Sequence, residues 1–168
     1  MKCPSCGSNN ITGADECESC RQDLASLDGV VAKTKMEKVL MSDPISKLAP
    51  RPPMVISKTA SVLEAVEQMN TARRGSLLVL DSGILEGIVT ERDVVLKALG
   101  TKKDLKDIPV SAIMTANPES LSSDDSVAYA VNRMSIGGYR HIPILKDGKP
   151  TGMISIRDVM RYLSKLFP

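Results

Sequence analysis

The chain has 168 residues, of which 42% are apolar and 25% charged, with a formal net charge of +2 and a sequence pI near 8.3. This composition favours one or two globular domains, and the mild charge with three Tyr, one Phe and no Trp argues against a nucleic-acid or membrane surface. No apolar run approaches the roughly 18 to 20 residues of a membrane span. The sequence opens with MKCPSC instead of the basic and then apolar segments of a signal peptide, so we expect a cytoplasmic protein.

All four cysteines lie near the start of the chain, in two C-x2-C pairs. Each pair can form a knuckle that points two thiolates at one centre, an arrangement that suits tetrahedral Zn²⁺. Gly7 can supply a left-handed turn after the first pair. We predict a zinc ribbon over residues 1–26, with metal ligands Cys3, Cys6, Cys17 and Cys20.

The predicted ribbon is structural, because four thiolates leave no open position on the metal for water or substrate. So short a segment buries little apolar surface, and its order must come from the metal. Two alternatives remain open. Two disulfides are disfavoured by a reducing compartment. A rubredoxin-like iron centre for electron transfer usually has a longer insert and an aromatic shell, and residues 1–26 contain no aromatic residue.

Residues 27–44 follow the ribbon and are predicted to form a linker helix. Val31, Met36, Val39 and Leu40 fall roughly on one helical stripe, and Pro44 closes the segment. We expect this helix to lie on the next domain and to tether the ribbon.

The remaining chain is a tandem repeat. At an offset of 65 residues, 45–95 aligns with 110–160 without a gap, and 14 positions are identical. Two copies of one supersecondary unit are implied, each too small to bury its own apolar face. We place repeat one at 45–100, a linker at 101–109 and repeat two at 110–168.

Each repeat reads as β-α-β-β-α. The first element is a short extended piece, MVISKT in repeat one and ESLSSD in repeat two. A helix then begins near Ser61 in repeat one and near Ser126 in repeat two, and Ser61 with Glu64 predicts a capping box. SLLVL with ILEGIV, and HIPIL with PTGMIS, predict two pairs of strands. ERDVVLKALG and IRDVMRYLSKLF predict the closing helices.

A seven-residue phrase occurs once in each repeat, as GIVTERD at 87–93 and GMISIRD at 152–158. Together with the S-V-x-x-A-V-x-x-M helix and RHIPIL, it resembles a pair of CBS domains, a Bateman module, over about residues 45–167. This resemblance implies an α/β (α+β) fold in which the two repeats pack around a pseudo-twofold axis. It also implies frequent dimerisation into a flat disc, and binding of adenine nucleotides in clefts between the copies.

The repeated phrase has two physical interpretations. Thr90 and Ser155 stand where a strand turns into a helix, and Asp93 and Asp158 follow three residues later, as in a capping box. The same first turn offers N–H groups and a positive dipole end to a phosphate, and a carboxylate beside it can accept ribose hydroxyls. The glycine permits close backbone approach, and the apolar residues after it can line a slot for a base. With the repeat in view, we favour ligand binding.

The repeats differ where a phosphate is expected. Repeat two has Arg140 and His141 at the strand edge that often supplies basic contacts in the resembled family, and repeat one has Gly75 and Ser76 there. Arg73 and Arg74 stand one or two positions earlier and could substitute only if the backbone presents them inward. His141 is equally well explained as a partly exposed strand-edge residue. The predicted ligand-binding residues are Val55, Ile56, Gly87, Val89, Thr90, Arg92, Asp93, Ser120, Leu121, Arg140, His141, Pro143, Gly152, Ile154, Ser155, Arg157 and Asp158.

Two function hypotheses follow, and no catalytic constellation is visible, so we predict no enzyme. In the first, an adenine nucleotide such as AMP, ADP, ATP or an S-adenosylmethionine-like ligand binds the CBS pair as a regulatory signal, and the zinc ribbon contacts a protein partner. In the second, the CBS pair is a dimerisation disc and the ribbon recruits protein or nucleic acid. A homodimer through VVLKAL and VMRYLSKLF is expected in both.

Overall fold

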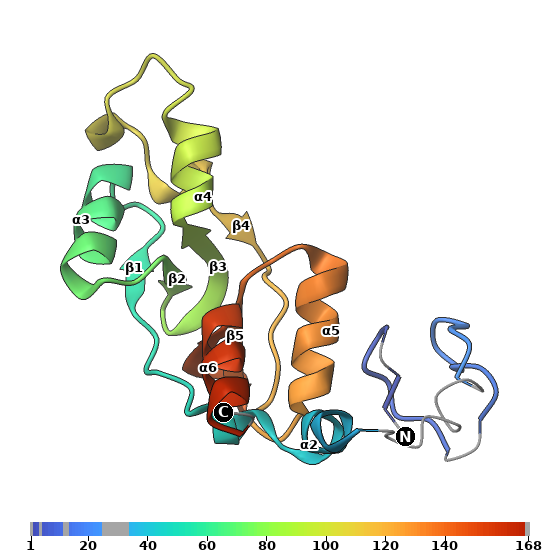
Figure 1. The fold of residues 1–168 in the computed structure, drawn as a ribbon. Coiled ribbons are helices and arrows are strands. Elements are labelled where there is room, and N and C mark those ends of the chain that lie inside the picture. Colours follow the sequence, from blue (N-terminus) through green and yellow to red (C-terminus); the bar gives the residue numbers. More distant parts are fainter. Residues whose placement is uncertain (1, 4, 12–13, 25–33, 167–168) are drawn as a thin grey trace. The chain divides into compact units, whose positions relative to one another are not determined.

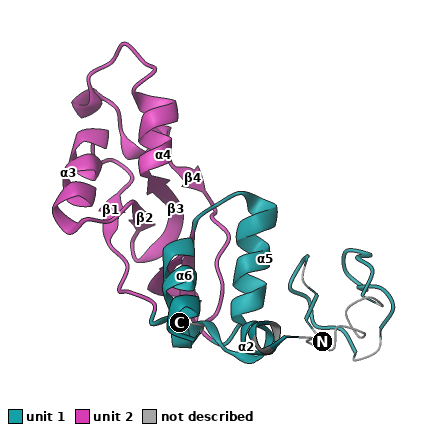
Figure 2. Ribbon diagram, viewed as in Figure 1, with its two compact units in different colours: residues 1–49, 124–140, 156–168 teal, residues 50–123, 141–155 magenta. Residues whose placement is uncertain are grey.

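The computed structural model describes residues 2–3, 5–11, 14–24 and 34–166 (Figure 1). The chain divides into two compact units, shown in Figure 2: unit 1 contains residues 1–49, 124–140 and 156–168, and unit 2 contains 50–123 and 141–155. This division cuts across repeat two, because its strands belong to unit 2 and its helices to unit 1.

Unit 2 is built on the strands of both repeats. Repeat one contributes β1 (Val55–Ser57), β2 (Ser76–Asp81) and β3 (Ile84–Thr90), and β4 (Thr115–Ala116) completes a four-stranded sheet in the order β1-β2-β3-β4. β1 and β2 are parallel, and helix α3 (Val62–Ala72) makes the crossover that parallel neighbours require. The other two pairings are antiparallel.

Helix α3 begins as predicted. Ser61 Oγ accepts a hydrogen bond from Glu64 N at 3.2 Å, and Ser61 N donates to Glu64 Oε2 at 2.7 Å, so the capping box is confirmed. Its apolar face enters a core formed with the sheet and the segments after it. The fully buried members of this core are Val62, Ala65, Leu77, Val79, Val89, Ala98 and Val110.

The closing helix of repeat one has an irregular geometry. α4 (Glu91–Asp93) is one α-helical turn that continues as the π-helix η2 (Val94–Ala98), and Leu99 N donates to Val94 O at 3.1 Å across the wider turn. Two 3-10 turns that the pattern does not predict, η3 (Leu105–Asp107) and η4 (Val110–Ala112), lead to β4. Short turns of this kind carry no periodic apolar signal.

Repeat two contributes the antiparallel pair β5 (His141–Lys146) and β6 (Lys149–Ser155) to unit 2. The predicted extended piece ESLSSD is wrong as a strand, because its six described residues form a single parallel bridge, Leu121 with Ile144. That bridge has the register of Ile56 with Val79 in repeat one, shifted by 65 residues. Repeat two therefore retains the pairing with fewer hydrogen bonds.

The leading segment of each repeat pairs with the other repeat. Thr115 and Ala116, which precede the Leu121 bridge of repeat two, lie beside Ile88 and Gly87 on β3. Arg51, ahead of β1, exchanges backbone hydrogen bonds with Met153 on β6, at 2.9 and 3.2 Å. Ile88 and Met153 are aligned in the repeat, and both are buried in one small cluster with Leu78. This reciprocal exchange within unit 2 fits the predicted pairing of two CBS-like repeats.

The described helices of unit 1 are α2 (Lys35–Ser42), the 3-10 turn η1 (Ile45–Leu48), α5 (Val127–Gly137) and α6 (Ile156–Leu166). α2 lies within the predicted linker helix, of which residues 27–33 are outside the described part of the chain. Val39 and Leu40 are half-buried, whereas Met36 is 41% exposed and does not belong to a buried stripe. Val31 lies outside the described residues. Tyr162 on α6 donates a hydrogen bond to Asp43 just after α2, which joins the last helix of the unit to its first described helix.

Candidate functional site

In repeat one the phrase stands at the junction that the sequence predicts. Gly87 to Thr90 end strand β3, and α4 begins at Glu91. Asp93 Oδ2 accepts hydrogen bonds from Thr90 N at 3.0 Å and from Thr90 Oγ1 at 2.6 Å, while Asp93 N donates to Thr90 Oγ1 at 3.3 Å. The capping-box interpretation is confirmed for this repeat.

A lysine that the sequence reasoning missed completes this cluster. Lys97 Nζ lies 2.7 Å from Asp93 Oδ1 and donates to the Ile113 carbonyl at 2.8 Å. A carboxylate has about four lone-pair positions, of which the Thr90 and Lys97 contacts use three. Asp93 therefore keeps one position for a further donor. The i,i+4 spacing of Asp93 and Lys97 is the sequence signal that could have found this pair.

The position aligned with Arg140 is Gly75, and an acidic side chain lies over it. Glu91 N donates to the Gly75 carbonyl at 3.1 Å, which holds the start of α4 against the end of the preceding loop. A Cβ added to Gly75 would lie 3.1 Å from Glu91 Cδ and from Oε2. Repeat one thus presents a carboxylate where repeat two has a guanidinium.

Repeat two has the same backbone junction with different charges. Ile156 N donates to the Arg140 carbonyl at 3.0 Å, the counterpart of the Glu91–Gly75 bond. Asp158, in the first turn of α6, is 6% exposed and pairs with Arg161, whose Nη1 lies 2.8 Å from Asp158 Oδ1. The Arg140 side chain is exposed. Arg140 and Asp158 therefore come to the same end of α6.

The other predicted ligand-binding residues fall into two groups. Ile56 and Val89 belong to the core of unit 2, so their side chains pack within the fold. Leu121, Pro143, Ile154 and Ser155 are also buried, and His141 pairs in register with Ser155 at the start of the β5–β6 pair. Exposed or half-buried positions are Val55, Arg92, Ser120, His141 and Arg157, and their role in ligand binding stays a prediction.

The glycines of the phrase have a packing role. A Cβ at Gly87 would lie 2.7 Å from Met114 Sδ and 3.0 Å from the Thr115 carbonyl, and one at Gly152 would lie 2.8 Å from Pro50 Cβ. The close backbone approach expected for a ligand is thus occupied by the segments that cross from the other repeat. Without a structure, Met114 and Pro50 carry no signal of this contact.

The four cysteines converge as predicted. Their Sγ atoms all lie within 4.8 Å of one another, with Cys3 to Cys20 at 3.6 Å and Cys6 to Cys17 at 3.5 Å. Tetrahedral Zn²⁺ with Zn–S bonds of about 2.3 Å needs sulfurs roughly 3.8 Å apart, so the donor set and spacing fit that ion. No disulfide joins these four cysteines.

Two backbone knuckles hold the cysteines. Gly7 N donates to the Cys3 carbonyl at 2.9 Å, and Arg21 N donates to the Cys17 carbonyl at 2.9 Å. Both turn residues have a positive φ, 72° for Gly7 and 60° for Arg21, so the left-handed turn predicted at Gly7 is confirmed and recurs after the second pair.

The thiols titrate unequally. The hydrogen bond with the Ser8 hydroxyl, 3.0 Å away, lowers the pKa of Cys17 to about 5. For Cys20 the Gln22 N–H lowers the pKa, but the nearby Cys6 thiol, burial and the Cys3 thiol raise it by more, to about 12. Crowded thiolates repel one another, and a bound cation would remove that repulsion and release protons.

A family model described as the CBS domain matches residues 45–100 and 110–165. The chain belongs to the CBS domain family. Its two CBS repeats, predicted from the 65-residue offset, are therefore established, and the mixed α/β fold is confirmed.

Solved structures agree with this assignment. A protein with CBS domains from Burkholderia ambifaria MC40-6 is 30% identical and has a TM-score of 0.67 over 78% of this chain and 94% of its own. A CBS domain protein from Pyrobaculum aerophilum, solved in complex with AMP, is 27% identical and has a TM-score of 0.65 over 74% of this chain and 98% of its own.

Curated relatives match the CBS region. An uncharacterized 17.7 kDa protein of Acidianus ambivalens is 37% identical over 125 residues, which cover 73% of this chain and 74% of that protein. The CBS domain-containing protein CBSCBSPB5 of Arabidopsis thaliana is 32% identical over 104 residues, but these are only 19% of its length. Within the described residues, no helix is both long enough and apolar enough to span a membrane.

Proposed function

We propose that this protein is a non-enzymatic sensor in which the CBS repeats bind an adenine nucleotide and the four-cysteine ribbon is a structural zinc site that contacts a protein partner. The observation that carries the proposal is the repeated phrase. In each repeat it sets a hydroxyl residue and an aspartate at the start of a helix, within a fold that resembles an AMP-bound relative. Family membership supports the regulatory role.

Repeat two is the stronger candidate for a phosphorylated ligand. Arg140 lies at the N-terminal end of α6, where the positive end of the helix dipole also favours an anion. Asp158 lies in the same first turn and can accept ribose hydroxyls. The guanidinium contact to a phosphate is charge-assisted, so it adds affinity that repeat one does not have.

Thermal and calorimetric titration with AMP, ADP, ATP, S-adenosylmethionine and adenosine tests this proposal. A ligand at about a hundred times its dissociation constant should add about 2.7 kcal/mol to the free energy of unfolding per independent site. We expect at least one of the five to raise the melting temperature. If none does, the phrase is a pair of helix caps.

Single substitutions assign the contacts. Asp158→Ala should remove most of the binding, and Arg161→Ala is its control, because it breaks the same ion pair without touching the proposed ligand groups. Arg140→Ala should weaken nucleotides far more than adenosine, and Lys146→Ala at the other end of β5 should weaken neither. Equal loss of affinity in Asp158→Ala and Arg161→Ala would mean that the aspartate acts only through stability.

The alternative is an adaptor, in which the CBS pair only dimerises and the ribbon recruits another macromolecule. The capping box and ion pair that already occupy Asp93 favour the adaptor, since they explain this aspartate without a ligand. The ligand titration decides between the two, because an adaptor requires no adenine nucleotide.

Elemental analysis tests the metal. We expect one Zn²⁺ per chain, bound by Cys3, Cys6, Cys17 and Cys20. Cys17→Ser should lose the metal, and a chelator should disorder residues 1–26 while the CBS repeats stay folded, because their cores contain other residues. Iron in place of zinc would give a coloured protein and point to electron transfer. Protein purified without chelator that contains neither metal would contradict the ribbon.

A further inference from the structure

The two CBS repeats differ in charge at one aligned place. Repeat one has Gly75 with the Glu91 carboxylate folded over it, and repeat two has Arg140 with Ile156. The backbone is the same in both, because the amide after the strand donates to the carbonyl at the strand edge at 3.1 Å in repeat one and 3.0 Å in repeat two. The difference is therefore in side chains and amounts to two units of charge.

The Glu91 carboxylate stands where a phosphate would approach the start of α4. Its Cδ and Oε2 lie 3.1 Å from the place of a Gly75 Cβ, so it packs against the position that is aligned with Arg140 in the repeat. A like charge there opposes a phosphate, and Gly75 itself carries no basic side chain, while Arg74 and Arg73 stand one and two positions earlier at the end of α3. Asp93, in contrast, keeps a lone-pair position for a ribose hydroxyl beside its Thr90 and Lys97 partners.

We propose that Glu91 makes repeat one selective against phosphate, so that this repeat takes adenosine-type ligands with a neutral or cationic 5′ group while repeat two takes the nucleotide. The inference rests on the proposed adenine-nucleotide function and adds a specificity-determining residue to it. The full chain then binds one phosphorylated nucleotide in repeat two. Its other adenine site, in repeat one, binds ligands without a phosphate.

The test isolates repeat one in an Asp158→Ala chain, with adenosine and AMP as probes in isothermal titration calorimetry. In this background adenosine should bind more tightly than AMP. Adding Glu91→Gln should tighten AMP by about tenfold at low salt, and by less at high salt, because only a charge repulsion is removed. The affinity for adenosine should change by less than about twofold, because adenosine has no phosphate and a surface substitution usually has only a small effect.

Glu67→Gln on α3 is the matched control, since it removes one exposed carboxylate elsewhere in repeat one and should leave AMP affinity unchanged. The double variant Gly75→Arg with Glu91→Ile copies repeat two and, in an otherwise unaltered chain, should raise AMP stoichiometry from one to two. Urea unfolding of each variant confirms that the fold is retained.

The possible results distinguish the role of Glu91 from adenine-nucleotide binding itself. An unaltered chain that binds two AMP molecules with equal affinity overturns the role of Glu91 and leaves the nucleotide sensor standing. Glu91→Gln that tightens adenosine as much as AMP also overturns it, because the effect is then not on phosphate. A chain that binds no adenine ligand overturns both proposals.

Discussion

At the residue scale, each aspartate of the repeated phrase has a structural partner. Asp93 closes a capping box and pairs with Lys97, and Asp158 pairs with Arg161. Such contacts hold a carboxylate in one orientation, which serves a helix start and a ribose site equally well. The removal of either aspartate therefore changes stability as well as affinity, so each substitution needs a control that breaks only the ion pair, as Arg161→Ala does for Asp158.

The Tyr162–Asp43 hydrogen bond predicts a pH-dependent contribution to stability. Burial and the hydrogen bond to Asp43 raise the pKa of Tyr162 to about 12, while Lys47 and Tyr162 lower the pKa of Asp43. Because the pKa of Tyr162 is raised in the folded state, its contribution to the free energy of unfolding is complete below the unfolded-state pKa of about 10. This contribution is lost as the pH rises through about 12. The Asp43 contribution is present above its ordinary pKa and is lost in acid.

Tyr162→Phe should lower the free energy of unfolding by about 1.5 to 3 kcal/mol at neutral pH, the usual range for a hydrogen bond to a charged group. Urea unfolding of the single and double variants with Asp43→Asn measures the coupling. A coupling energy within about 0.3 kcal/mol of zero would show that the two side chains act independently.

At the element scale, the crossing segments explain why each phrase begins with glycine. Gly87→Ala places a Cβ 2.7 Å from Met114 Sδ and 3.0 Å from the Thr115 carbonyl, so the Met114 side chain must move and the Thr115 backbone must adjust slightly. We expect a loss of about 1 to 3 kcal/mol in the free energy of unfolding, as for other overpacked sites. Gly100→Ala is the matched control, because its Cβ meets nothing within 4 Å.

Urea unfolding compares these glycine variants. Gly100→Ala should be neutral or slightly stabilising, since alanine restricts the unfolded chain. The packing explanation fails if Gly87→Ala is as stable as Gly100→Ala. A loss of adenosine binding by Gly87→Ala at unchanged stability would instead assign the glycine to the ligand.

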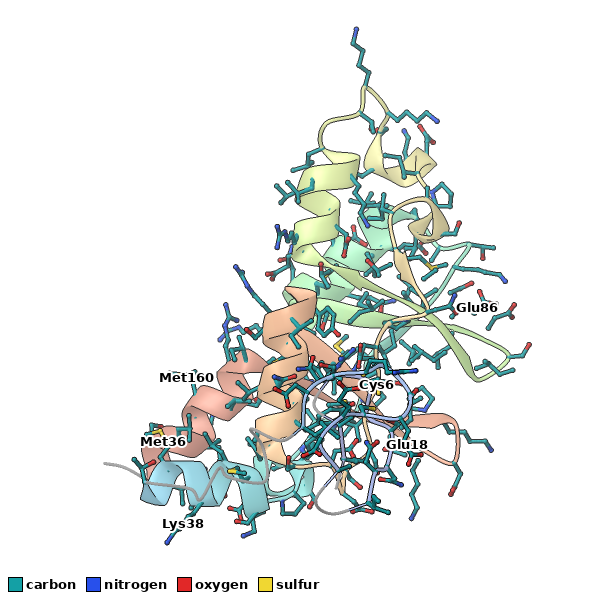
Figure 3. All side chains as sticks on the ribbon, turned by 90° about the vertical axis from the view of Figure 1, so that its right-hand side faces the viewer. Cys6, Glu18, Met36, Lys38, Glu86 and Met160 are labelled. Carbon is teal, nitrogen blue, oxygen red and sulfur yellow. The ribbon has the colours of Figure 1, made fainter. Side chains whose placement is uncertain are left out.

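At the scale of the whole molecule, exposed apolar side chains on the closing helices support the expected homodimer. Val95, Leu96 and Leu99 on and after η2 are 58%, 65% and 60% exposed, and Met160 on α6 (Figure 3) is 61% exposed. Groups of exposed apolar side chains, such as the three on and after η2, mark association sites more often than single exposed residues do. We propose that they form the interface between two chains.

Sedimentation should therefore give a dimer at micromolar concentration. Leu96→Glu should shift it towards monomer, because it buries a charge in the proposed interface. Ile84→Glu, an apolar side chain 68% exposed at the start of β3, should leave the dimer intact. A monomer at all concentrations, or equal dissociation in both variants, would contradict the helical interface.

Local chemistry is why so much could be predicted from the sequence. Cysteine spacing, the 65-residue repeat, the Ser61–Glu64 and Thr90–Asp93 caps and most strands are readable because each depends on residues near one another in the chain. The tertiary structure alone decided contacts between distant segments. These include the packing of Met114 and Pro50 against the two glycines, Lys97 on the Ile113 carbonyl, and the position of the Glu91 carboxylate over Gly75. The Met114, Pro50 and Ile113 contacts depend on how the repeats exchange their leading segments, and the Glu91 contact depends on how α4 packs on the loop before β2. The spacing of residues along the chain records neither arrangement.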